Sequence, residues 1–251
     1  MNRLRIDKLV LGEGIPKICV PIVGRCEAEI LQEVAAVRDA KPDLAEWRVD
    51  FYEKADDVHA VEEMLSCLKD ELDEIPFLFT FRTKAEGGNR SITPEDYCRL
   101  NRMAAESQKP VLIDVEIDVP GSDDLIGNIH ESGGLVIASH HNFLCTPTDG
   151  FMKEKLHEME EKGADVLKLA VMPQSEMDVL RLLQVTVQMR DQSEKPIVTM
   201  SMSSLGVISR ISGILTGSAL TFASLGAASA PGQIPLQEMK ELLSQMELYG
   251  K

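Results

Sequence analysis

Eight short apolar runs recur along this 251-residue chain every 25 to 35 residues or so, and their spacing constrains the fold more than any other feature. Each run is followed by a polar turn and then by a segment of helical periodicity, a pattern typical of parallel strands joined by helices. The runs occupy residues 18–23, 44–50, 77–82, 111–116, 135–141, 165–171, 196–201 and 218–222.

Amphipathic segments alternate with these runs, and we expect helices at residues 27–38, 58–72, 94–108, 150–162 and 176–191. Thr93 is a good N-cap, and Pro94 suits the first turn of the helix that follows it. Eight strand–helix units predict a (β/α)8 TIM barrel, which usually needs about 250 residues. We therefore expect one domain over residues 1–251, with residues 1–13 capping the N-terminal end of the barrel.

An open, doubly wound sheet is the competing architecture. That fold usually carries a glycine-rich phosphate-binding turn after its first strand. Residues 23–26 read Val-Gly-Arg-Cys, which is not such a turn. The count of eight units also favours the closed barrel.

The amino-acid composition limits the kinds of partner that this protein is expected to bind. The 41 acidic and 26 basic residues give a net charge of -15, so the basic surface that contacts nucleic-acid phosphates is not expected. No stretch reaches the roughly 18 apolar residues of a membrane span, and the N-terminus has no signal-peptide pattern, so we expect a cytoplasmic protein. The five cysteines and five histidines show no metal-binding spacing, and no metal is expected.

Lys168 lies within the run at 165–171, whose other residues indicate a buried strand. Desolvation disfavours the charged form of a lysine, and a neutral amine can attack a carbonyl group to form a Schiff base. A lysine that pairs with a carboxylate or extends to the strand end is the structural alternative. His141, one strand earlier, supplies the proton carrier that Schiff-base chemistry needs.

Charged residues also share faces at the ends of the other predicted strands. Alternation in a strand places Glu46, Arg48 and Asp50 on one face. It does the same for Thr80 with Arg82 and for Asp114 with Glu116. Inward charges are costly unless they pair or take part in chemistry, so these residues form either a structural ion-pair network or an active site. We expect Asp50, Asp114 and Glu116 to be supporting residues.

Three loops complete the candidate site. Glu86 precedes two glycines, which allow a sharp turn that brings its carboxylate over the barrel mouth towards a histidine. Arg210 follows the seventh run, early in a predicted helix, where a guanidinium can bind a carboxylate or phosphate through two hydrogen bonds. Residues 228–233 have the composition of a mobile lid, and also of a plain turn.

Six segments in order resemble the type I 3-dehydroquinate dehydratase family over nearly the whole chain. They are Glu-Trp-Arg-Val-Asp at 46–50, Phe-Arg-Thr-Lys-Ala-Glu-Gly-Gly at 81–88, Ser-His-His-Asn-Phe at 139–143, Lys-Leu-Ala-Val-Met-Pro at 168–173, Gly-Val-Ile-Ser-Arg at 206–210 and Ser-Ala-Pro-Gly-Gln at 229–233. Any one of them alone is weak, but the ordered set is specific.

The resemblance implies a shikimate-pathway lyase, a Schiff-base barrel that dehydrates 3-dehydroquinate to 3-dehydroshikimate for aromatic amino acid biosynthesis. It implies no cofactor, and a homodimer. By the same resemblance Lys168 forms the imine, His141 is the general acid and base, and Glu86 positions His141. The residues implied to bind substrate are Glu46, Arg48, Arg82, Arg210, Ser229 and Gln233, of which Arg210 holds the substrate carboxylate.

Two segments depart from the family pattern. His140 and Asn142 stand where a tyrosine and an aspartate often flank the catalytic histidine. Residues 202–206 read Met-Ser-Ser-Leu-Gly, with serines where the family has more glycine. A class I aldolase or transaldolase acting on a sugar phosphate is the enzymatic alternative, and a non-catalytic barrel that binds a carboxylate is the other.

Overall fold

The computed structural model describes residues 3–6, 8–226 and 230–249 of the chain. Within these ranges one parallel sheet runs in the order β11-β10-β3-β4-β5-β6-β7-β8-β9. Its strands β3 to β10 coincide with the eight predicted runs to within two residues. They span Lys17–Ile22, Leu44–Arg48, Phe77–Thr80, Leu112–Glu116, Val136–Asn142, Val166–Val171, Ile197–Ser201 and Leu220–Ser224.

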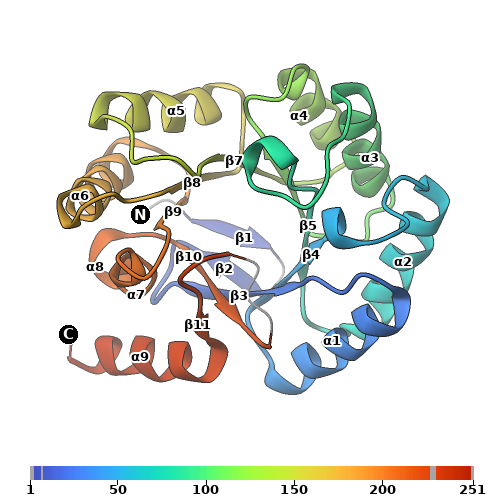
Figure 1. Cartoon of the computed structure of the whole chain (residues 1–251), viewed down its shortest axis with the longest axis horizontal. Coiled ribbons are helices and arrows are strands. Elements are labelled where there is room, and N and C mark those ends of the chain that lie inside the picture. Colours follow the sequence, from blue (N-terminus) through green and yellow to red (C-terminus); the bar gives the residue numbers. More distant parts are fainter. Residues whose placement is uncertain (1–2, 7, 227–229, 250–251) are drawn as a thin grey trace.

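The last and first strands of the series meet and close the sheet into a barrel. The Ala219 N–H, just before β10, donates to the Ile197 carbonyl of β9 at 2.7 Å. Ile197 and Ser218 form a parallel bridge. A short strand, β11 (Ile234–Pro235), pairs with the end of β10. The predicted barrel is therefore confirmed, and Figure 1 shows its strands enclosed by a ring of helices.

The helices follow the strands in alternation. They are α1 Glu27–Ala40, α2 Val58–Glu71, α3 Pro94–Glu106, α4 Ser122–Glu131, α5 Asp149–Glu161, α6 Glu176–Gln192, α7 Val207–Ile211, α8 Gly213–Thr216 and α9 Leu236–Tyr249. The five predicted helices are α1, α2, α3, α5 and α6. Thr93 caps α3 as predicted, since its hydroxyl accepts the Asp96 N–H at 3.1 Å. In the described part of the chain no helix is long and apolar enough to cross a membrane.

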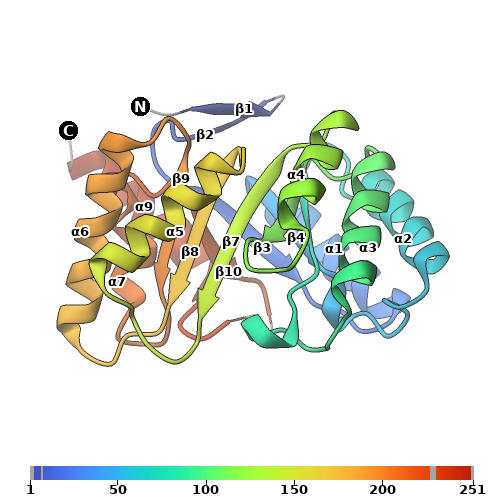
Figure 2. The ribbon, with the colours of Figure 1, turned by 90° about the horizontal axis from the view of Figure 1, so that it is seen from above.

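A hairpin of β1 (Leu4–Ile6) and β2 (Leu9–Leu11) precedes the barrel. It lies at the end opposite the arrowheads of β7 and β8 in Figure 2, which is the N-terminal end of the strands. Its apolar side chains join one buried cluster with inward residues of the barrel strands, among them Leu44 and Leu112. The hairpin thus covers the N-terminal end of the barrel, away from the carboxyl ends of the strands.

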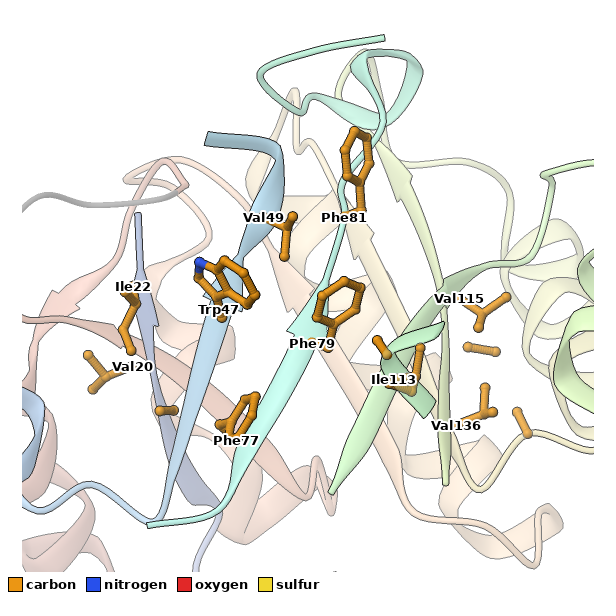
Figure 3. Close-up of a cluster of buried hydrophobic side chains, with 14 of the residues drawn as sticks. Val20, Ile22, Trp47, Val49, Phe77, Phe79, Phe81, Ile113, Val115 and Val136 are labelled. Atoms are coloured by element: carbon orange, nitrogen blue, oxygen red, sulfur yellow. The ribbon is translucent and has the colours of Figure 1, made fainter. Parts of the chain in front are cut away.

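The larger apolar cluster lies between the strands and the helices. Outward side chains of the sheet, such as Trp47 and Phe79, pack with helix residues such as Ile30 and Leu65. Trp47 meets the Phe79 ring edge-on at 5.8 Å between centroids. Figure 3 shows the outward row from Val20 through Phe77 to Val136. Burial of these side chains fixes which residues of each strand point into the barrel.

Inward residues form two layers. The first residue of each inward row is apolar, as with Leu44, Leu78, Leu112, Ile137 and Val166. The next ones towards the strand ends are buried and polar: Glu46, Arg48, Thr80, Asp114, Glu116, Ser139 and Lys168. The predicted alternation is confirmed, and the charged layer faces the carboxyl ends of the strands.

Two predicted strand ends need correction. Asp50 was expected in a strand, but β4 ends at Arg48 and residues Val49–Phe51 form the short helix η1. Arg82 lies two residues beyond the end of β5. The two segments are linked, because the Asp50 carboxylate accepts the Arg82 backbone N–H at 3.3 Å.

Candidate active site

A pocket opens at the carboxyl ends of the barrel strands, where active sites of this fold lie. The structure brings together here most of the residues predicted from the sequence: Glu46, Arg48, Arg82, Glu86, His141, Lys168, Arg210 and Gln233. They come from six different strands or the loops that follow them, so only the closed barrel assembles them.

Lys168 lies at the centre of this polar layer on β8, with 3% of its surface exposed. Its Nζ lies 3.0 Å from Asp114 Oδ2 and 3.9 Å from Glu46 Oε1. The Phe222 ring of β10 packs against the amine, 4.7 Å from Nζ to the ring centroid. The prediction of a buried strand lysine is confirmed, and the amine has both a counter-ion and an apolar wall.

Asp114 binds three partners at once. Besides Lys168, its carboxylate accepts Arg82 Nη2 at 2.8 Å and the Ser139 hydroxyl at 2.6 Å. Complete burial opposes the ionisation of Asp114, but Arg82 and Lys168 outweigh burial, and its pKa falls to about 2. Asp114 therefore remains an anion and holds a cation on each side.

Arg82 extends the network towards β6. Its Nη1 donates to Glu116 Oε1 at 2.9 Å and to the Ser139 hydroxyl at 3.0 Å. Glu116 is fixed in turn by Thr83, whose backbone N–H and hydroxyl each donate to it at 2.7 Å. The guanidinium is thus a structural bridge whose edge also lines the pocket.

His141 and Glu86 form a pair at the pocket wall. His141 Nδ1 lies 2.9 Å from Glu86 Oε2, and the same oxygen accepts the His141 backbone N–H at 3.1 Å. Burial lowers the pKa of His141 well below its usual 6.5, and Arg82 and Lys168 lower it further. The imidazole is therefore neutral near pH 7.

The pKa of Glu86 is shifted in the opposite direction, upward. Burial raises its pKa to about 9, and the carboxylates of Glu116, Asp114 and Asp118 add to this effect while Arg82 opposes it. Ionisation of Glu86 lets His141 donate from Nδ1 and leaves Nε2 as a free base. Above the pKa of Glu86, His141 Nε2 can therefore act as a base. Below that pKa, the pair of side chains retains one more proton.

The turn after Glu86 places this carboxylate. Gly87 has φ +82°, and a Cβ there would lie 2.3 Å from the Phe143 ring. A Cβ on Gly88 would lie 1.9 Å from the Arg82 carbonyl oxygen. The tight turn expected from the two glycines is present, because neither position has room for a side chain.

Arg48 and Glu46 lie on the opposite wall. Arg48 donates from Nε and Nη2 to the two oxygens of Asp50, each at 2.8 Å. Asp50 is itself held by the Asn89 backbone N–H at 2.9 Å. Glu46 accepts the Thr80 hydroxyl at 2.9 Å and faces Lys168.

Arg210 is almost fully buried on α7, yet its fork is largely unused. One nitrogen, Nη2, donates to the Pro231 carbonyl at 2.9 Å. Its Nε and Nη1 have no hydrogen-bond partner among the described residues. Burial lowers the pKa of Arg210 to about 10, so it remains a cation at neutral pH. Buried donors without a partner among the described residues, on a cation that lines the pocket, fit an anionic ligand.

The predicted lid follows β10. Gln233 lines the pocket, whereas Ser229 lies outside the described residues. The loop that follows β9 lies against the predicted lid, because the Ser203 carbonyl oxygen would be 2.3 Å from a Cβ on Gly232. Ser203 itself adopts φ +60°. The serine at 203 therefore takes the left-handed conformation for which glycine is better suited.

Several pocket residues were missed from the sequence. Phe143, Met200, Met202 and Phe222 line the pocket and supply its apolar surface. A signal existed for all four, because they continue the inward alternation of their strands. Phe143 and Met202 each lie one residue beyond the end of a strand, β7 and β9, and keep its inward parity.

The two residues beside His141 lie outside the pocket lining. His140 Nδ1 is 2.6 Å from Asp118 Oδ2, and the Asn142 side chain accepts the Leu144 and Cys145 N–H groups. His140, Asp118 and Glu86 could each offer a ligand atom to a cation, within 4.8 Å of one another. However, Lys155 already forms an ion pair with Asp118.

The arrangement combines four chemical elements within one pocket. These are a buried amine beside an anion, a neutral imidazole beside the carboxyl group of Glu86, an arginine with free donors, and an apolar wall. Such a set can bind a substrate that has both a carboxylate and a ketone. The amine can attack the ketone carbon, and the imidazole can remove a proton from the carbon beside it.

Comparisons with known proteins agree on one family. The model of the type I 3-dehydroquinase family matches residues 18–249. A 3-dehydroquinate dehydratase from Clostridium kluyveri is 42% identical over 250 residues, covering 98% of both chains.

Two solved structures are also similar over nearly their full length. One is a type I 3-dehydroquinate dehydratase from Clostridium difficile with covalently modified comenic acid, at TM-score 0.95, 41% identity and 98% coverage of both chains. The other is a 3-dehydroquinate dehydratase from Geobacillus kaustophilus, at TM-score 0.97, 35% identity and full coverage of both chains.

Proposed function

Because this chain belongs to the type I 3-dehydroquinase family and is an enzyme of that type, we propose that it dehydrates 3-dehydroquinate to 3-dehydroshikimate through an imine at Lys168. The observation that carries this mechanism is the amine of Lys168, buried at the base of the pocket beside Asp114. The structure of the C. difficile relative contains covalently modified comenic acid, which is in keeping with a nucleophilic residue in that protein.

Imine formation joins Lys168 Nζ to the ring ketone carbon and releases one water. The iminium nitrogen withdraws electrons from the neighbouring carbon, so that a proton there becomes acidic. Asp114, an anion at 3.0 Å from the amine, is placed to balance the iminium charge. No organic cofactor is needed for this step, because the imine itself accepts the electron pair.

His141 removes that proton. Its Nδ1 faces Glu86, so Nε2 is the nitrogen left to act as the base. The proton passes to Nε2 and the C–H electrons form an enamine. When the enamine electrons return, the hydroxyl one carbon further leaves, and the same proton from Nε2 makes it water. Hydrolysis of the conjugated imine consumes one water and restores the Lys168 amine.

The remaining residues bind and orient the substrate. Arg210 offers Nε and Nη1 to the substrate carboxylate, as the resemblance implied. Glu46 and the guanidinium groups of Arg48 and Arg82 face the ring hydroxyls across the pocket. Gln233, with Ser229 from the same loop, closes over the bound ring.

Borohydride trapping tests this proposal. With 3-dehydroquinate present, borohydride should reduce the imine to a secondary amine and add a ligand-sized mass to the peptide that contains Lys168. Lys168→Arg keeps the positive charge but cannot form the imine, so we expect binding without turnover and no adduct. An adduct on another lysine, or turnover by Lys168→Arg, would refute the mechanism.

Three further expectations remain proposals. Activity should survive dialysis against a chelator, because no step uses a metal. The enzyme should be a homodimer, which light scattering after size-exclusion chromatography measures directly. It should act in the cytoplasm, within the shikimate pathway of aromatic amino acid biosynthesis, and loss of the gene should be compensated by supplied aromatic amino acids.

A further inference from the structure

The Glu86 carboxylate lies between two imidazoles. Its Oε2 is 2.9 Å from Nδ1 of His141, which faces the pocket. Its Oε1 is 3.7 Å from Nδ1 of His140, the preceding residue of β7. Neighbouring residues of a strand point to opposite faces, and Glu86 reaches both because it lies on η2 (Lys84–Glu86), in the loop that follows β5.

His140 is held in one orientation. Its Nδ1 lies 2.6 Å from Asp118 Oδ2, and its ring packs against Phe151 of α5 at 5.9 Å between centroids. Burial raises the pKa of Asp118, but the hydrogen bonds from Lys155 and His140 outweigh burial, and the net shift is downward. Asp118 is therefore an anion at neutral pH, and His140 Nδ1 must carry the hydrogen that lies between them.

This hydrogen also separates two carboxylates. The facing oxygens of Glu86 and Asp118 lie within 4.8 Å of each other, with His140 Nδ1 near both. The charged or titratable groups around Glu86 come from β6 and its loop, β7 and the segment after β5. They are Asp114, Glu116, Asp118, His140, His141 and Arg82. Most of the carboxylates lie on the β6 side, so Glu86 is in an anionic environment.

We propose that His140 is a positioning residue for the dehydration, whose Nδ1–H shields Glu86 from Asp118 and so keeps Glu86 able to accept the Nδ1 proton of His141. This inference rests on the proposed roles of Glu86 and His141. Lys155 is part of the same device, because its ammonium neutralises the outer oxygen of Asp118. The outward histidine thus acts on the reaction without touching the substrate.

The consequence is a shift of the pH profile. Without the His140 N–H, two carboxylates face each other directly, and the pKa of Glu86 rises. Without the charge of Asp118, the pKa of Glu86 falls. Glu86 also lines a second pocket with Asp118 and Thr83, outside the substrate pocket. Its proton can therefore exchange with solvent while substrate is bound, so that the shift appears in kcat as well as in kcat/KM.

Three variants test this inference by steady-state kinetics from pH 6 to 10. His140→Leu and His140→Asn have nearly the same size and shape, but only asparagine offers an N–H close to the position of Nδ1. The limb measured is the rise of kcat with increasing pH. We expect His140→Leu to move the midpoint of this limb to a pH higher by about 0.5 to 1 unit, and Asp118→Asn to move it to a lower pH by about as much. His140→Asn should retain the wild-type position of the limb.

Equal shifts in His140→Leu and His140→Asn would show that His140 acts by packing alone, and would overturn the inference. Shifts of the same sign in His140→Leu and Asp118→Asn would overturn it too. If His140→Leu does not fold, Asp118→Asn decides the question, because a limb that does not move down in this variant would overturn the inference. Borohydride trapping at Lys168 runs in parallel, because a wild type without an adduct defeats the proposed mechanism and not the role of His140.

Discussion

Lys168 Nζ lies 3.0 Å from Asp114 Oδ2, and both side chains are buried in the barrel interior. Asp114 also binds Arg82, so one carboxylate contacts two cations of the polar layer. Because buried charges are costly without a partner, the stability of the barrel mouth and the chemistry of its amine depend on the same side chain.

Asp114→Asn should therefore destabilise the protein at pH 7 by about 3 to 5 kcal/mol, since it leaves Lys168 and Arg82 short of one anion. The pKa of about 2, against an ordinary 3.8, means that Asp114 contributes stability above pH 4, amounting to about 2 kcal/mol, and loses it as the pH falls towards 2. Urea titrations at pH 7, 4 and 2.5 measure both effects. A variant with wild-type stability at pH 7 would contradict the assigned pairing.

His141→Ala should slow turnover by about 10² to 10⁴-fold, because it removes the proposed proton carrier. Imine formation at Lys168 should remain at least partly intact, so borohydride should still trap an adduct when substrate is added. Rapid-quench analysis of adduct and product separates the two steps. Unimpaired turnover would rule out His141 as the base.

The wild-type kcat/KM should rise with pH along a limb near pH 9. Glu86, with its pKa raised to about 9, must lose a proton before His141 Nε2 is free, whereas His141 itself is already neutral above its lowered pKa. Glu86→Gln should remove this limb, because the amide oxygen accepts from Nδ1 at every pH. Rate measurements in one buffer series for both proteins check this, and a limb that persists in Glu86→Gln would assign it to another group.

Arg210→Met should raise KM by about 100-fold with a smaller change in kcat, because about 3 kcal/mol of carboxylate binding is lost while the side-chain volume is kept. The free Nε and Nη1 donors are the reason for this expectation. A substrate analogue with the carboxylate replaced by a neutral amide provides the cross-check. Wild type and variant should bind this analogue equally, and a remaining preference of the wild type would argue against the contact.

Gly87→Ala should lower kcat by displacing Glu86, because its Cβ would enter the Phe143 ring and its φ is +82°. Gly133→Ala is the matched control, since Gly133 has φ +79° but no atom within 4 Å of a Cβ. Both substitutions should cost about 1 kcal/mol of backbone strain, and only the first should affect activity. Equal kinetics in the two variants would show that the turn tolerates a side chain.

Much of the fold was predictable because strand and helix periodicities are local properties of the chain. The eight strands appeared at the predicted positions, and the inward parity of Lys168, Asp114 and Glu116 was readable from alternation alone. Strand ends were less predictable. Asp50 leaves β4 because its carboxylate binds Arg48 and the Arg82 N–H, and these partners are distant in sequence or lie in a turn.

The sequence by itself determined the order of strands and helices, the face on which each charged residue lies, and a lysine that must be buried. Only the tertiary structure decided which of these charges meet. The register between strands sets Ser139 beside Lys168 and Glu116 beside Ser139, and barrel closure brings Phe222 of β10 against an amine on β8. Register and closure depend on packing over the whole sheet, so no local pattern could assign Asp114 to Lys168, the free fork to Arg210, or the second imidazole to Glu86.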